Sequence, residues 1–352
     1  MKKIALFLAI VACCLGASAQ NLAKNEMTQL QAFLSQPAQE AATNAEALKV
    51  SDMKSLAGIE GVKIENGHVT AIDWKGKKLA GSLDLSGFSA LKTIDVSKNR
   101  LTSVDLTNDA SLYNVNVSRN RLTNFVITGC SHIVKLNVSN NRLTEITLAD
   151  VPFVTDLNVA ANYLVSLDVS GSSTLETLNC QSNHLETLSV ENCTALKSLY
   201  AGYNKLTGVT LVGLIKLQNL NLDDNNIANL VVYNLPSLSF YVCSDNNMQG
   251  LAVKDCPVVL DIVCSYNDLT TFSVSNCPQL QYVDCSYNDL TTLNLSNQNF
   301  LQRLICNNNQ LTSLNVSFDS SLTYINCRTN MISDLNTQGC TSLRMLASEG
   351  NY

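Results

Sequence analysis

The stretch that decides the fold is LETLNCQSNHLETLSVENCTA, residues 175–195, because its 21-residue pattern recurs along most of the chain. The pattern returns as LKTIDVSKNRLTSVDLTNDAS at 91–111 and as LQRLICNNNQLTSLNVSFDSS at 301–321. No unit after Leu91 carries an insertion. A fixed repeat of this length is typical of a solenoid, in which no unit buries its apolar face alone and stacked units share a continuous core.

The strictest column of the repeat is an asparagine that returns at one spacing in thirteen successive units. It follows the segment LxxLxV/C, whose second half alternates like a strand with one buried face. An amide carries two donors and an acceptor, so we expect it to satisfy buried backbone groups of its own turn and of the next coil. This asparagine ladder comprises Asn99, Asn120, Asn141, Asn162, Asn183, Asn204, Asn225, Asn246, Asn267, Asn288, Asn309, Asn330 and Asn351.

The second half of each unit, LTxLxL, alternates again and predicts a second short strand on the opposite side of the coil. The predicted architecture is therefore a solenoid of about 13–14 coils, with a parallel β-sheet on one face and a short strand per coil on the other. The first unit, near Val69, is atypical and places Trp74 in a column later held by valine or cysteine. Because terminal repeats act as caps, we interpret Trp74 as a core plug and not as a binding aromatic.

The residues ahead of the repeats predict a signal peptide and a cap. Two lysines at 2–3, an apolar run over 4–15 and the sequence ASA at 17–19 match a signal peptide over 1–19. A rival interpretation makes Cys13 the lipidated residue of a lipoprotein, but its apolar core would be only about six residues. We therefore expect export to the extracellular space, the periplasm or the cell surface.

Residues 20–68 predict a small, mainly helical N-terminal cap, and 69–352 the repeat domain. Apolar residues at helical spacing over 27–34 indicate one helix, and those over 41–48 a second. Asn66-Gly67, between two short apolar segments, predicts a hairpin turn. No apolar stretch is long enough to span a membrane.

The 21-residue unit resembles a class of bacterial leucine-rich repeats of the form LxxLxL/CxxNxLxxLDLxx, sometimes called the IRREKO type. The resemblance covers roughly residues 69–352, about four-fifths of the chain. It implies a leucine-rich-repeat solenoid whose members are mostly interaction proteins. It supplies no catalytic residue that could be transferred to this sequence.

The composition argues against disorder and against nucleic acid as a partner. Hydrophobic residues make up 46% of the chain and charged residues only 15%. Without the two lysines of the signal peptide, 21 basic residues stand against 29 acidic ones, a net charge of −8. A chain this acidic is poorly suited to nucleic acid or to anionic membrane surfaces.

The cysteines of the mature chain fall in two columns, and we expect them to be mostly free thiols. Neighbours in one column would lie about 4.8 Å apart with parallel side chains, beyond the usual Cβ separation of a disulfide. The alternative of a metal site lacks paired Cys-x-x-Cys spacing and a nearby histidine. Six replace an inward valine: Cys180, Cys243, Cys264, Cys285, Cys306 and Cys327. Five lie in the polar stretch that closes the coil: Cys130, Cys193, Cys256, Cys277 and Cys340.

No catalytic motif accompanies the repeat, and we predict neither an enzyme nor a cofactor. The three histidines, His68, His132 and His184, fit no nucleophile, zinc or phosphate motif. A calcium site among the aspartates is a weaker alternative, because the glycine-rich calcium-binding repeat is absent.

The outward positions of the predicted strands form continuous columns whose character changes along the chain. Early units present basic residues around asparagines, and later units present aromatic and acidic residues. Aromatics exposed in successive coils of one face are typical of binding surfaces, so the later units are the favoured site. The basic stripe is Lys98, Arg100, Arg119, Arg121, Lys135 and Arg142, around Asn116, Asn137 and Asn158. The candidate ligand-binding residues are Tyr200, Tyr203, Asp223, Phe240, Asp245, Asp261, Tyr266, Asp268, Tyr282, Asp284, Tyr287, Asp289 and Tyr324, with Asp224 beside them.

These observations favour a non-catalytic protein-binding or adhesion module exported from a bacterial cell. The alternative is a glycan-binding surface protein, because exposed tyrosines flanked by aspartate and asparagine also suit sugars. An enzyme is a distant third hypothesis, which would require a close carboxylate pair in a closed pocket. The sequence identifies no particular ligand.

Overall fold

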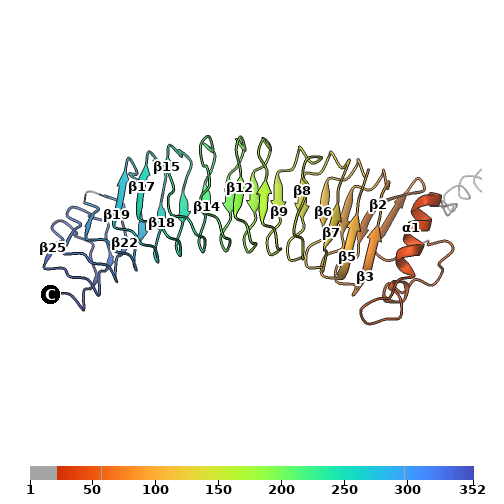
Figure 1. Cartoon of the computed structure of the whole chain (residues 1–352), viewed down its shortest axis with the longest axis horizontal. Coiled ribbons are helices and arrows are strands. Elements are labelled where there is room, and N and C mark those ends of the chain that lie inside the picture. The colour runs from red at the N-terminus through yellow and green to blue at the C-terminus, as the bar shows by residue number, and fades with distance from the viewer. Residues whose placement is uncertain (1–21, 57, 297) are drawn as a thin grey trace, which may run out of the picture. The chain divides into compact units, whose positions relative to one another are not determined.

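The computed structural model describes residues 22–56, 58–296 and 298–352, so the predicted signal peptide and Cys13 lie outside the described chain. The chain divides into two compact units, the first ending at Ile133 and the second beginning at Val134. Each unit is a stack of coils joined by parallel strands (Figure 1). The predicted solenoid with its parallel sheet is confirmed. No helix among the described residues is long and apolar enough to cross a membrane.

The first unit begins with two helices and a hairpin. Helix α1 (Lys24–Leu34) is the first predicted helix, while α2 (Asn44–Ala47) is only one turn long. Thr43 accepts a hydrogen bond from the backbone N–H of Glu46 at 3.2 Å, which caps α2 and starts it later than predicted. Strand β1 (Val62–Glu65) pairs antiparallel with β2 (His68–Asp73) through the Asn66-Gly67 turn. Both turn residues have positive φ, at 51° and 78°, as this tight turn requires.

Trp74 closes the core of the first unit, as predicted. Its side chain is fully buried and stacks on Phe33 of α1, with ring centroids 5.6 Å apart. The indole Nε1–H donates to the backbone oxygen of Glu60 at 3.0 Å. Helix α1 therefore covers the end of the stack and the indole keeps its one polar group satisfied.

Parallel strands continue on both sides of the first unit. On one side β2 is followed by β4 (Thr93–Asp95) and β6 (Asn114–Asn116). On the other side β3 (Ala80–Asp84) pairs with β5 (Arg100–Asp105), which pairs with β7 (Asn124–Val126).

The second unit carries a long parallel sheet on one side, whose solvent-exposed surface we call the strand face. Its strands are mostly three residues long, with the middle residue buried and its two neighbours pointing outward. The register pairs residues 21 positions apart, so each outward position forms a column. The strands are β8 (Lys135–Asn137), β9 (Asp156–Asn158), β11 (Thr177–Asn179), β13 (Ser198–Tyr200), β14 (Asn219–Asn221), β16 (Phe240–Val242), β18 (Asp261–Val263), β20 (Tyr282–Asp284), β22 (Arg303–Ile305), β24 (Tyr324–Asn326) and β26 (Met345–Ala347).

The opposite side of the second unit, which we call the back face, differs from the prediction of one short strand per coil. Its strands form three separate small sheets, and the coils at 144–149 and 207–212 contain no strand. At 207–212 the sequence TGVTLV places Gly208 where the preceding coil has Thr187, and glycine weakens a strand locally. The sheets are β10 (Ser166–Asp168) with β12 (Thr187–Ser189); β15 (Val232–Tyr233), β17 (Gly250–Lys254) and β19 (Thr271–Ser275); and β21 (Thr292–Asn294), β23 (Ser313–Asn315) and β25 (Asp334–Asn336).

The asparagine ladder joins each coil to the preceding one. The sequence had instead predicted bonds to the next coil. The amide of Asn183 donates to the backbone oxygens of Cys180 in its own turn and Val159 in the preceding coil, at 3.0 and 3.1 Å. Its oxygen accepts from the backbone N–H of Leu164 at 3.0 Å. The same bonds recur at Asn204, Asn225 and later members. Each amide thus satisfies backbone groups that burial would otherwise leave unpaired.

Candidate functional site

The candidate residues of the second unit occupy two kinds of column on the strand face. One kind consists of outward strand positions, and register places Phe240, Asp261 and Tyr282 side by side in it. The other, which we call the turn column, lies just after the strand, where the chain bends ahead of the ladder asparagine. Its members Tyr203, Tyr266 and Tyr287 have φ values of 57°, 53° and 54°. This left-handed conformation disfavours bulky side chains, so the surrounding hydrogen-bonded turn must hold it in place.

Tyr266 and Tyr287 form an exposed stack in the turn column. Their ring centroids are 4.2 Å apart and the ring planes differ by 9°. The two side chains remain 50% and 43% exposed. A hydrogen bond with the Tyr287 hydroxyl raises the pKa of Tyr266. The pair therefore offers apolar ring surface together with two hydroxyl groups that can exchange hydrogen bonds with a ligand.

A second aromatic assembly lies on the outward column of β20, β22 and β24. The guanidinium of Arg303 sits between Tyr282 and Tyr324, at 5.7 and 5.1 Å from the two ring centroids. Register places the three residues in successive strands. Arg303 was missed by the sequence analysis, although its 21-residue spacing from both tyrosines was the available signal. The cation–π contacts hold these side chains in a fixed row.

Tyr282 also connects this row to an acidic residue. Its hydroxyl donates to Asp284 Oδ2 at 3.4 Å, and Asp284 Oδ1 accepts from the backbone N–H of Ser286 at 3.0 Å. Burial, followed by the charge of Asp284, raises the pKa of Tyr282 to about 12. The phenol therefore remains a protonated hydrogen-bond donor throughout the physiological pH range.

Acidic side chains surround the aromatic assemblies. Asp245 is exposed, and its pKa is raised by partial burial and by the neighbouring charge of Asp224. The pKa of Asp223 is raised by burial, and its Oδ1 atom is buried without a hydrogen-bond partner. Asp261, on β18, is half-buried, and burial raises its pKa. Asp268 and Asp289 lie exposed, two residues beyond the stacked tyrosines.

The structure brings some candidate residues together and separates others. Tyr266 and Tyr287 belong to adjacent coils, as do Asp268 and Asp289. Tyr203 lies in the same turn column but three coils before Tyr266, with Asp224 and Asp245 between them. Phe240 is 43% exposed and lies between Asn219 and Asp261 in its column, while Tyr200 is half-buried on β13.

The basic stripe is divided between the two units. Lys98, Arg100, Arg119 and Arg121 are exposed on the first unit, and Lys135 and Arg142 are exposed on the second. The asparagines of the stripe are engaged in their own turns: Asn116 Oδ1 accepts from the Ser118 hydroxyl at 2.7 Å, and Asn137 does the same with Ser139. These amide oxygens serve the fold and are less available to a ligand.

No disulfide joins the cysteines of the described chain, and the inward column is fully buried. Burial raises the pKa of Cys180 and of Cys243 to about 12, so both thiols stay protonated. The cysteines of the second column, which lie in a polar stretch of the sequence, are nevertheless buried, except for the half-buried Cys340. The Cys193 thiol donates to the backbone oxygen of Val169 in the preceding coil at 3.1 Å, and Cys340 does so with Val316 at 3.0 Å.

No group of three or more His, Cys, Asp or Glu side chains in the described part of the chain is placed to hold a metal ion. His132 and His184 are both exposed, and the His184 ring stacks on Tyr163 with centroids 5.7 Å apart. His68 lies at the cap, where its Nδ1 is 2.8 Å from a carboxylate oxygen of Glu26.

Solved structures of leucine-rich-repeat proteins resemble this chain. The functional domain of InlJ from Listeria monocytogenes, which includes a cysteine ladder, matches with a TM-score of 0.59 and 24% identity, over 83% of this chain and 68% of that domain. A leucine-rich-repeat protein from Leptospira interrogans matches with a TM-score of 0.57 and 21% identity, over 78% of this chain and 86% of that one. The internalin InlF from Listeria monocytogenes matches with a TM-score of 0.59 and 18% identity, over 91% and 94% of the two chains.

These similarities show that the chain has the fold of the leucine-rich-repeat solenoids, including bacterial ones, as the resemblance of the repeat implied. No protein-family model matches the chain. No curated protein matches the sequence of this chain.

Proposed function

We propose that this chain is a non-catalytic module that binds a protein partner on the strand face of residues 200–324. The observation that carries the proposal is the pair of aromatic assemblies on neighbouring coils, Tyr266–Tyr287 and Tyr282–Arg303–Tyr324. Rigid tyrosines and arginine are the side chains that dominate the energetics of protein interfaces. Here their mutual contacts hold them in place before any ligand arrives, which lowers the entropy cost of binding.

The acidic surroundings define the partner's chemistry. Asp245, Asp268 and Asp289 are exposed around the stacked tyrosines. Carboxylates at the rim of an aromatic centre favour a partner whose contacting surface is basic at its edge and apolar or amphipathic at its middle. Arg303 adds one cation, but its guanidinium is already placed between two rings.

Protein is favoured over glycan, the alternative from the sequence, by the arrangement of the rings. Sugar binding relies on free aromatic faces against which a pyranose ring can stack. The rings of Tyr266 and Tyr287 each cover one face of the other at 4.2 Å, and Tyr282 and Tyr324 each have Arg303 over one face. Each ring therefore has one face occupied by a neighbouring side chain, and the remaining edges and hydroxyl groups suit an irregular protein surface.

The same proposal extends to the class of repeat, to export and to the lack of catalysis. The 21-residue unit supports assignment to the IRREKO-type repeats, and residues 1–19 support export by a signal peptide. We also propose that the signal peptide ends at residue 19 and that the N-terminal cap ends at residue 68. We infer no catalytic role, because the inward cysteine column is fully buried, with the pKa values of Cys180 and Cys243 raised by burial, and the candidate aspartates lie on an open face.

The experiment is a crosslinking pull-down on cells with purified protein in three forms: wild type, Tyr266→Ala/Tyr287→Ala and Arg119→Ala/Arg121→Ala. We expect the tyrosine variant to lose the specific crosslinked protein and the arginine variant to keep it. Loss with the arginine pair alone would move the site to the basic stripe and contradict the proposal. Specific binding on a glycan array, with no protein captured, would replace it with the glycan alternative.

A further inference from the structure

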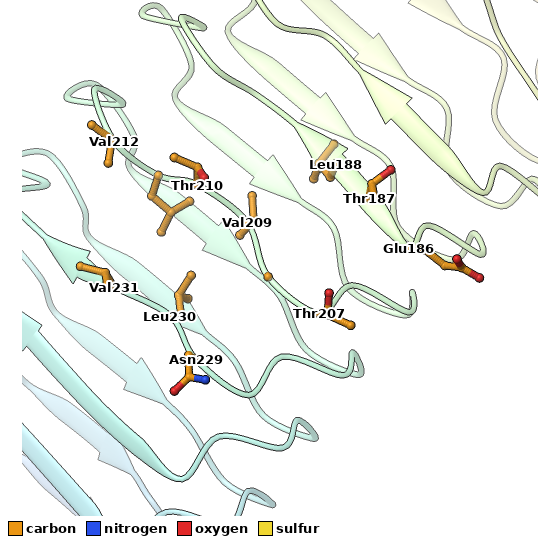
Figure 2. Close-up of a pocket in the computed structure, with 12 residues that line it drawn as sticks. Glu186, Thr187, Leu188, Thr207, Val209, Thr210, Val212, Asn229, Leu230 and Val231 are labelled. Atoms are coloured by element: carbon orange, nitrogen blue, oxygen red, sulfur yellow. The ribbon is translucent and has the colours of Figure 1, made fainter.

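The back face of the second unit contains an open groove where its strands are interrupted (Figure 2). The groove has a volume of about 550 Å³ and runs beside three successive coil segments, 186–188, 207–212 and 229–231. It lies on the opposite side of the coils from the aromatic strand face. A ligand in it would therefore leave the proposed site on the strand face free.

Backbone groups along the groove lack the pairing found on neighbouring coils. Earlier on this face the coils are joined, with Val169 N–H donating to Ser189 O at 3.0 Å. Later they are joined again, with Asn234 N–H donating to Lys254 O at 3.1 Å. Among the described residues between these points, no backbone hydrogen bond joins 207–212 to 186–191 or to 228–233. Strand β12 is thus paired with β10 on one side and open toward the groove on the other.

The floor and one end of the groove are apolar. Leu188 is nearly buried, while Val209 and Leu230, in the same inward column, are half-buried and partly open to the groove. Val212 and Val231 are 83% and 78% exposed, which is unusual for valine. Exposed apolar side chains that line one groove are typical of an interaction surface.

The two ends of the groove differ in polarity. Figure 2 shows Glu186 and Thr207 at one end and Val212 and Val231 at the other. Glu186 is the one titratable side chain among the lining residues. An occupant that complements this polarity carries a positive charge at one end and apolar side chains at the other.

We propose that this groove binds an extended segment of a partner protein, which adds to the open edge of β12. Main-chain hydrogen bonds to the open edge would supply affinity, and alternate side chains on Leu188, Val209 and Leu230 would supply specificity. Every strand pair of the back face in this unit is parallel, so a parallel segment begins at the Glu186 end. The segment therefore begins with lysine or arginine and continues with alternating β-branched residues.

The test measures fluorescence anisotropy of a labelled peptide, Lys-Thr-Val-Thr-Val-Thr-Val, titrated with the full chain. We expect saturable binding, weakened about tenfold or more by Val231→Lys and changed less than twofold by Val258→Lys, a valine that is 42% exposed outside the groove. A peptide N-methylated at alternate residues should bind at least tenfold more weakly, because it lacks donors for the β12 edge.

Charge reversal makes the test specific. A peptide that begins with glutamate should bind weakly to wild type and regain binding to Glu186→Lys. Equal binding of the N-methylated peptide, no effect of Val231→Lys, or sedimentation showing that a second copy of the chain occupies the groove would overturn the proposal. The Tyr266→Ala/Tyr287→Ala variant should bind the peptide like wild type. Failure of the groove proposal can therefore be distinguished from failure of the strand-face proposal.

Discussion

The ring of Tyr266 lies 4.2 Å from that of Tyr287, although both residues hold left-handed backbone conformations that bulky side chains disfavour. The coil spacing makes this possible, because equivalent positions of adjacent parallel strands lie about 4.8 Å apart. The repeat therefore places two rings at stacking distance without any additional loop.

The stacking should appear as a coupling free energy between the two tyrosines. In a double-mutant cycle of Tyr266→Ala and Tyr287→Ala, we expect a coupling of about 0.5–1.5 kcal/mol in the free energy of unfolding. Urea denaturation of the four proteins measures it. The control cycle pairs Tyr203 with Tyr287, which lie four coils apart and should be additive. A coupling near zero for the adjacent pair would show that the stack does not persist in solution.

Removal of one ladder amide should destabilise the fold. Asn204 donates to the backbone oxygens of Cys180 and Ala201 and accepts from the N–H of Leu185. Asn204→Ala would leave these groups unpaired, at a cost of about 1–3 kcal/mol in the free energy of unfolding. The matched control is Asn226→Ala, an exposed asparagine of the next coil. Equal denaturation midpoints for the two variants would refute the structural role of the ladder.

The inward cysteines should behave as apolar side chains and not as disulfide partners. Cys264 is fully buried at a position where earlier coils carry valine. We expect Cys264→Val to change the free energy of unfolding by less than about 1.5 kcal/mol, since the swap keeps an apolar side chain of similar volume. Cys264→Ser should cost about 1–3 kcal/mol, because it buries a hydroxyl.

Thiol titration supplies the second measurement for the cysteines. In denaturant without reductant, most of the eleven described thiols should react, and the native protein should react slowly. Recovery of only two or three thiols in denaturant would show that disulfides form.

A buried carboxyl in the first unit should make stability depend on pH. Burial raises the pKa of Asp109 to about 8, and its side chain is fully buried. Because the folded state holds the proton more tightly than the unfolded state, stability is fully present below about pH 4 and falls as pH rises toward 8. Each unit of pKa difference corresponds to about 1.4 kcal/mol, so a fall of at least this order is expected.

The variant Asp109→Asn should remove this part of the pH dependence. Thermal melts between pH 5 and pH 8 should show a smaller fall in Tm than wild type, while Asp334→Asn, at an exposed position, should follow wild type. An unchanged slope for Asp109→Asn would mean that its carboxyl ionises normally in the folded protein.

The sequence was sufficient for the stacked coils and the long parallel sheet, because the repeat determines which side chains of each coil face inward. The 21-residue spacing of leucine and asparagine determines which side chains face inward, and a shift of one residue in a strand would move its apolar side chains to solvent. The burial of Trp74 and the positive φ values at Asn66-Gly67 follow from the same local rules. The exposed tyrosine and aspartate columns could likewise be identified from periodicity.

The tertiary structure alone decided which of these side chains meet. Arg303 between Tyr282 and Tyr324, the thiol of Cys193 bonded to the preceding coil, and the open edge of β12 depend on side-chain rotamers and on the separation of neighbouring coils. A repeat fixes the register of residues because the pattern of burial is the same in each unit. It does not fix these contacts, because they arise from differences between units, such as Val209 in place of leucine, that change the packing locally.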